Sequence, residues 1–313
     1  YGQLICTADI TRSDKKQVIN PPFGAYGDKG DFFMKKGKLI FITAVAVAVC
    51  MGIGFYVQKH GFTDATSVEI GISAGQALLM DADTGEVLYE KCADQKAYPA
   101  STTKIMTALV TLETMEEYDS PLEQKVRVPE VAEGVEGSSI YLKAGEEISV
   151  QDLLYGLMLV SGNDAAVALA EIIGGDQEHF VEMMNDRAAE LGCSSTHFAN
   201  PNGLFDEDHY TTARDLAVIS AAAMKNGTFR EIVSTVDWKA EREESTYLTF
   251  HNKNKTITEF EGGSGIKIGY TKDSGRTLAA SAERDGRTMI AVVMSAPDWF
   301  NDAYRLMEFG FRQ

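Results

Sequence analysis

The stretch from Gly265 to Ser295 reads GIKIGYTKDSGRTLAASAERDGRTMIAVVMS, and it decides the fold. Three β-rich segments follow one another in it with short polar connections: 265–271, 276–283 and 287–295. Asp285-Gly286 is a typical two-residue hairpin turn between the last two segments. We therefore expect an antiparallel sheet near the end of the chain, followed by a helix over 299–309.

The chain upstream of this sheet begins with strands and continues with helices. Gln76–Asp81 and Glu86–Glu90 are strand candidates around an Asp-Thr-Gly turn, which predicts a hairpin. Apolar residues then recur at helical spacing in five segments: from about Ser101 onward, 152–160, 165–173, 177–191, and Thr212 to Asn226. This order predicts an α/β fold, an antiparallel sheet flanked by helices with an inserted all-helical lobe.

Composition excludes some classes of protein. The 313 residues include 29 Lys and Arg against 46 Asp and Glu, a net charge of −17, and 44% are hydrophobic. That much apolar material excludes global disorder. A chain this acidic lacks the basic face of a nucleic-acid groove, so we expect no nucleic-acid partner.

One segment departs from the soluble pattern. Residues 39–57 carry no charge over 19 positions, enough to span a bilayer, and a lysine cluster precedes them. We expect residues 1–33 to be an unstructured extension and 34–60 to be either a signal peptide or an uncleaved N-terminal membrane anchor. The exported part would be 61–313, which has 21 basic and 42 acidic residues and two cysteines, Cys92 and Cys193, that a bridge could join.

The first candidate for chemistry is Ser101-Thr-Thr-Lys104. Residues i and i+3 share a helix face, so the Lys104 amine can reach the Ser101 hydroxyl. A serine hydroxyl needs a base at neutral pH, and lysine serves as one only if burial or a neighbouring cation lowers its pKa. Alone, this motif more often marks a solvated helix start.

Two further motifs are also ambiguous when each is taken alone. Ser161-Gly-Asn163 follows an apolar helix, where a C-cap glycine with polar neighbours is the ordinary interpretation. Lys267-Ile268-Gly269 lies in an apolar strand, where a lysine is costly unless it reaches solvent or has a function. Gly269 would allow another backbone or a ligand to approach closely.

In this order the three motifs are typical of penicillin-recognising serine enzymes. The chain resembles the D-alanyl-D-alanine carboxypeptidases, the low-molecular-mass penicillin-binding proteins, from about residue 75 to its end. Five segments carry the resemblance: YPASTTKIMTAL (98–109), GSSIYLKAGEEISVQDLLYGLMLVSGNDAAVALAE (137–171), FANPNGL (198–204), HYTTARDL (209–216) and GIKIGYTKDSGRTLAAS (265–281). It implies a penicillin-binding, β-lactamase-like transpeptidase fold for 61–313, without the C-terminal β domain of some members.

The resemblance also implies the role of each site residue. Ser101 would attack the carbonyl between two terminal D-alanines, and Lys104 would take its proton. Ser161 would relay a proton to the leaving amine, and Asn163 would hold Lys104 and the substrate amide. The remaining roles concern binding: Lys267 would attract the terminal carboxylate, and the N–H groups of Ser101 and Tyr270 would form the oxyanion hole. The expected partners are peptidoglycan stem peptides and acylating β-lactam antibiotics, and no metal or organic cofactor is implied.

One position departs from the family pattern. The family normally has Lys-Thr-Gly where this chain has Lys-Ile268-Gly. The threonine hydroxyl donates a hydrogen bond to the substrate carboxylate, and isoleucine keeps the β-branched shape but cannot donate. A lost hydrogen bond to a charged group costs roughly 1.5–3 kcal/mol, so we expect a weakened enzyme.

Three other interpretations of the same motifs are a β-lactamase, a non-catalytic binding protein and a domain in which the motifs are accidental. A class A-like β-lactamase would need a Glu and an Asn four apart for its deacylating water, whereas Glu182 and Asn185 are three apart within a helix pattern. A non-catalytic cell-wall binding protein is suggested only by Ile268. An exported domain with accidental motifs would require three coincidences in the right order. The histidines show no metal-binding spacing, and His209 is expected to be structural.

Overall fold

The computed structural model describes residues 70–243 and 245–313. The predictions for 1–33 and for the apolar run at 39–57 lie outside these residues. Within the described ranges, no helix combines the length and apolar character needed to cross a bilayer.

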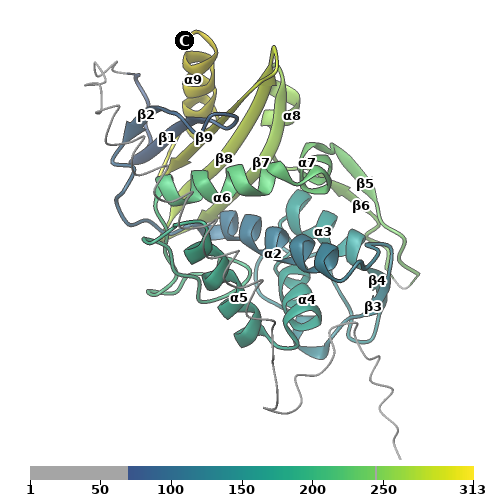
Figure 1. Ribbon diagram of the computed structural model, residues 1–313. Helices are drawn as coiled ribbons and strands as arrows, with labels where there is room; N and C mark the ends of the chain where they lie inside the picture. Colours follow the sequence, from purple (N-terminus) through teal and green to yellow (C-terminus); the bar gives the residue numbers. More distant parts are fainter. Residues whose placement is uncertain (1–69, 244) are drawn as a thin grey trace, which may run out of the picture.

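A five-stranded antiparallel sheet forms one layer, with the order β2-β1-β9-β8-β7 (Figure 1). Its strands are β1 (Gln76–Asp81), β2 (Val87–Lys91), β7 (Gly263–Thr271), β8 (Gly275–Arg284) and β9 (Arg287–Met294). Both predicted hairpins are confirmed. Asp285 and Gly286 join β8 to β9 with φ of 52° and 75°, as a turn with two left-handed residues requires.

The helices begin close to the predicted starts. The described helices are η1 (Ala100–Thr103), α2 (Lys104–Glu117), η2 (Glu130–Ala132), α3 (Val150–Leu159), α4 (Asn163–Gly174), α5 (Gln177–Glu190), α6 (Ala213–Lys225), α7 (Gly227–Ser234), α8 (Thr256–Glu259) and α9 (Trp299–Phe311). Ser149, Asp176 and Thr212 cap α3, α5 and α6, because each side chain accepts a backbone N–H three residues on, at 2.8–3.0 Å.

Two short antiparallel strand pairs were not predicted. They are β3 (Lys125–Arg127) with β4 (Glu147–Ser149), and β5 (Asp237–Lys239) with β6 (Thr249–His251). Strands of three residues are too short to show an alternating pattern, so no sequence signal marks them. Trp238 of β5 attaches its hairpin to the helical lobe by stacking on Tyr155 at 3.7 Å between ring centroids.

The sheet separates two apolar cores. Along β1, Leu78 faces the core shared with the helical lobe, and Leu79 faces the smaller core under α9. Val292 and Val293 of β9 divide in the same way, as side-chain alternation along a strand requires. Helices α6 and α2 therefore cover one face and α9 the other, which is the predicted α/β arrangement (Figure 1).

Candidate active site

Ser101 lies in the 3₁₀ turn η1, and helix α2 follows it from Lys104. The preceding residue, Ala100, has a φ of 49°, a left-handed conformation that is uncommon for a residue with a Cβ. The Ala100 carbonyl oxygen accepts a hydrogen bond of 2.8 Å from Thr103 Oγ1. Gly203 packs so closely that a Cβ there would overlap the same oxygen, so only glycine fits at that position.

His209 stabilises this turn through a hydrogen bond to Thr103. Its ring is 2% exposed, and Nδ1 accepts the Ala199 N–H at 3.0 Å, so Nε2 carries the proton and donates to Thr103 Oγ1 at 2.7 Å. Burial lowers the pKa of His209 to about 4, which keeps the ring neutral. The structural role expected for His209 fits this arrangement.

Lys104 is fully buried and joins the groups of the site. Its Nζ lies 3.0 Å from Ser101 Oγ and donates to Asn163 Oδ1 at 2.7 Å and to the backbone carbonyl of Asn202. Burial lowers its pKa well below the usual range, and the charge of Lys267 lowers it further. In its neutral form the amine would have two N–H groups to donate to Asn163 and Asn202, and its lone pair would then face the Ser101 hydroxyl.

Asn163 is the first residue of α4, and the neighbouring loop fixes its side chain. Its Nδ2 donates to the Glu136 carbonyl at 2.6 Å, while Asp164 accepts the N–H groups of Ile140 and Leu142 at 3.0–3.1 Å. Ser161 lies two residues earlier, is 6% exposed and has a φ of 67°. The connection between α3 and α4 is therefore tightly held around both predicted residues.

Lys267 and Gly269 lie on β7, the sheet edge next to η1. Lys267 is 1% exposed, and burial lowers its pKa to about 7, with a smaller effect from Lys253. The only hydrogen bond that its ammonium makes to a described residue is to the Ile268 carbonyl, at 3.1 Å. A Cβ on Gly269 would lie 2.9 Å from the Ser101 backbone nitrogen, so the glycine lets β7 approach the turn.

The other two predicted binding residues are more exposed. Tyr270 follows Gly269 and is 65% exposed. Ile268 is partly exposed and also packs against the apolar core under α9. Its side chain therefore contributes to the packing of the sheet edge.

Hydrogen bonds connect Ser101, Lys104 and Asn163 directly, and the charge of Lys267 acts on Lys104. Sequence reasoning missed three groups around them, namely the Asn202 carbonyl, Asp164 and Lys253, and it did not indicate that His209 would hold Thr103. The turn 200–203 was visible in the sequence as Asn-Pro-Asn-Gly, but nothing there indicated that its backbone would bind Lys104.

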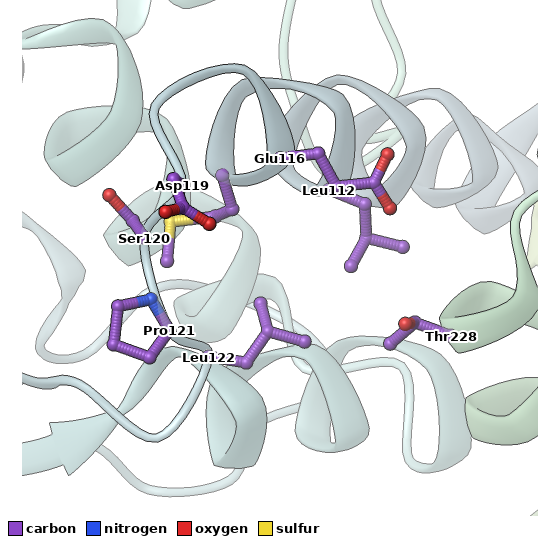
Figure 2. A pocket seen from close by; sticks show the side chains of 8 residues that line it. Leu112, Glu116, Asp119, Ser120, Pro121, Leu122 and Thr228 are labelled. Atoms are coloured by element: carbon purple, nitrogen blue, oxygen red, sulfur yellow. The ribbon is translucent and has the colours of Figure 1, made fainter.

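A surface pocket lies elsewhere, at the C-terminal end of α2 (Figure 2). It has a volume of about 460 Å³, and Leu112, Leu122 and Thr228 are among its lining residues. Lys104 begins the same helix, so the pocket is separated from Ser101 by the length of α2. It contains none of the candidate catalytic groups.

The described ranges contain no group of three His, Cys, Asp or Glu placed to hold a metal ion. Cys92 is exposed and Cys193 is buried, and both are free thiols. The bridge that the sequence left open is therefore not formed.

The fold and this site define a penicillin-binding type of serine peptidase. The solved structure of the Streptomyces K15 DD-transpeptidase matches with a TM-score of 0.72 at 33% identity, over 79% of this chain and 100% of that chain. The sequence profile of the D-alanyl-D-alanine carboxypeptidases, peptidase family S11, matches residues 63–298. The chain belongs to this family of serine peptidases.

Curated relatives agree. D-alanyl-D-alanine carboxypeptidase DacF of Bacillus subtilis is 38% identical over 248 residues, which are 78% of this chain and 64% of that protein. The D-alanyl-D-alanine carboxypeptidase of Streptomyces sp. strain K15 is 34% identical over 86% of this chain and 98% of its own length. The matched region thus spans just under two thirds of the Bacillus protein and nearly all of the Streptomyces protein.

Proposed function

We propose that this protein is a serine D-Ala-D-Ala carboxypeptidase that trims the terminal D-alanine from peptidoglycan stem peptides through an acyl-enzyme on Ser101. One observation carries the proposal. The fully buried Lys104 amine lies 3.0 Å from Ser101 Oγ, and two other acceptors occupy its N–H groups. A lysine in that state is a base directed at the serine hydroxyl.

Acylation would begin when Lys104 Nζ takes the Ser101 proton and Oγ attacks the carbonyl carbon of the penultimate D-alanine. Negative charge would then develop on the carbonyl oxygen, which the N–H groups of Ser101 and Tyr270 would stabilise. Losing one such donor typically costs about 3–4 kcal/mol of transition-state stabilisation. The close approach of Gly269 to Ser101 supports a role for the next backbone N–H of β7 in this oxyanion hole.

The leaving group would be the terminal D-alanine, whose amine must gain a proton as the C–N bond breaks. Ser161 would relay that proton from Lys104. Lys267 would bind the terminal carboxylate, since a buried ammonium with one hydrogen bond among the described groups has donors left for an anion. A bound carboxylate would also favour the charged form of Lys267, whose pKa is otherwise about 7.

Water would release the shortened peptide, and penicillin would acylate the same serine and leave it slowly. Glu182 and Asn185, the two residues considered for a lactamase-like deacylating water, lie on α5 and make other contacts. Asn185 Nδ2 donates to the Val181 and Phe198 carbonyls at 3.1 and 2.9 Å, and Glu182 contacts His179 at 3.3 Å. These contacts favour a carboxypeptidase over an efficient β-lactamase.

The location proposed for this activity is the outer face of the bacterial membrane or the cell wall. It follows from the lysine cluster and the apolar run at 39–57, which are typical of export. Peptidoglycan stem peptides lie on that side of the membrane.

Release of D-alanine from a peptide ending in D-Ala-D-Ala tests the proposal. The wild-type protein should release D-alanine, and Ser101→Ala should abolish the release while its thermal unfolding stays unchanged. A peptide ending in L-Ala-L-Ala is the matched substrate control. Equal release by the wild type and the Ser101→Ala variant would contradict the proposal.

A further inference from the structure

Lys253 is a third lysine beside the candidate site, and none of the steps proposed above uses it. It lies in the turn between β6 and α8, and its Nζ donates to the Val160 carbonyl at 3.0 Å. Its backbone N–H donates to the Leu159 carbonyl at 3.1 Å. Two hydrogen bonds therefore hold Lys253 at the end of α3, and Ser161 directly follows Val160 in the chain.

The turn that carries Lys253 is itself firmly held. The neighbouring Asn252 donates from Nδ2 to the carbonyls of Val233 and Thr235, at 3.0 and 2.9 Å, at the end of α7. On the other side of Lys253, Asn254 Oδ1 accepts the Thr256 N–H at 3.1 Å. The backbone on both sides is fixed, so the ammonium is held near the α3 terminus.

Its charge acts on both lysines of the site. Lys253 lowers the pKa of Lys267, second only to burial, and it adds to the effects of burial and Lys267 on Lys104. Asp164 opposes these effects on Lys104, and the neutral His209 ring contacts Thr103 of η1. The charged groups near the Lys104 amine are thus two cations and one carboxylate.

We propose that Lys253 is a positioning residue of the active site, whose ammonium fixes the backbone before Ser161 and adds a positive charge to that of Lys267 near the Lys104 amine. This inference rests on the proposed acylation of Ser101. The positive charge of Lys253 disfavours a proton on Lys104, which must be neutral to act as a base. It also disfavours a proton on Lys267, so both titrations depend on Lys253.

The test is the pH dependence of acylation by a fluorescent penicillin in Lys253→Gln, Lys253→Arg and the wild type. Without the charge the pKa of each site lysine rises, so both limbs of the acylation profile should move to higher pH, by roughly half a unit or more. On the acid limb, where Lys104 must lose its proton, acylation of Lys253→Gln should therefore fall about threefold, and on the alkaline limb it should rise. Lys253→Arg keeps the charge and should keep the wild-type limbs.

Lys255→Gln is the matched control, since Lys255 lies two residues on, is exposed and pairs with Glu259 at 3.3 Å. It should leave the profile unchanged. A Lys253→Gln profile whose limbs do not move would overturn the inference. This includes a profile that is lower by the same factor at every pH, which is the result that a purely structural role of Lys253 predicts. A wild-type protein that penicillin does not label would instead overturn the proposed function.

Discussion

Ala100 and Ser161 both have backbone conformations that L-residues rarely adopt, with φ of 49° and 67°. Such conformations cost roughly 1–3 kcal/mol each and persist only where the surroundings enforce them. Thr103 and Gly203 enforce the first. Local sequence preference predicts neither conformation, which is why the sequence located Ser101 near a helix start but could not predict the 3₁₀ turn in which it lies.

The substitution Ile268→Thr should raise the rate of penicillin acylation or of D-alanine release. A threonine hydroxyl would add a hydrogen bond to the substrate carboxylate, worth roughly 1.5–3 kcal/mol, or about 10- to 150-fold in rate. The smaller side chain also loses packing against the core under α9, so a modest fall in melting temperature should accompany the gain.

Ile268→Val is the control, because it removes a similar amount of packing without adding a hydroxyl. Acylation and turnover that both stay at the wild-type level in Ile268→Thr would show that our account of position 268 is wrong.

His209 should make folding stability depend on pH. Its pKa is about 4 in the folded protein and about 6.5 when exposed, so the unfolded chain binds the extra proton first as the pH falls. The stabilisation is complete above pH 6.5 and is lost progressively between pH 6.5 and 4, by about 3 kcal/mol. Urea unfolding of the wild type and His209→Gln across this range measures the effect.

The carboxyl groups titrate in the wild type and in His209→Gln alike. The quantity to compare is therefore the difference between the unfolding free energies of these two proteins. His209→Gln should be less stable at pH 7, and the difference should narrow as the pH approaches 4. His179→Gln, at an exposed histidine, should follow the wild type. A difference for His209→Gln that stays constant with pH would contradict a neutral buried ring.

Among the elements, the link between the loop at 138–147 and the β5–β6 hairpin is a buried ion pair. Arg242 donates to both Glu146 oxygens at 2.6 and 2.9 Å, and neither side chain is more than 2% exposed. Arg242 also donates to the Ile140 carbonyl at 2.7 Å, two residues from the Ser138 carbonyl that accepts the Asn163 N–H. The ion pair thus connects the hairpin to the loop that holds Asn163.

Arg242→Met should destabilise the protein by about 3–5 kcal/mol, because it leaves the Glu146 carboxylate buried without a partner. The double variant Arg242→Met/Glu146→Leu should recover much of that loss. Arg127→Met is the control, since Arg127 and Glu147 form an exposed ion pair worth about 1 kcal/mol or less. Urea unfolding distinguishes these results, and a double variant no more stable than Arg242→Met would contradict the explanation.

Element prediction succeeded where patterns were long or capping residues clear. The strands over 76–81 and 287–294 and the helices capped by Asp176 and Thr212 agree with the structure within about a residue, and the helix capped by Ser149 agrees within two. The short strands β3 to β6 were missed because three residues cannot show a period.

At the scale of the whole molecule, the negative net charge of the chain contrasts with the positive charges at its candidate site. The chain has a net charge of −17, yet its candidate site contains three lysines, two of them almost completely buried. The sequence identified Lys104 and Lys267 by motif. It gave no sign of Lys253 or of the Asn202 carbonyl, because long-range packing of the turns at 200–203 and 252–254 brings them to the site.

The central claim is that Ser101 is a nucleophile activated by a neutral Lys104. Mass spectrometry of the purified protein incubated with penicillin tests it most directly. We predict a mass increase of one penicillin on the wild-type protein, persisting for minutes or longer, and no increase on Ser101→Ala or Lys104→Ala. A wild-type protein that gains no mass, or a Ser101→Ala variant that gains the same adduct, would contradict the account.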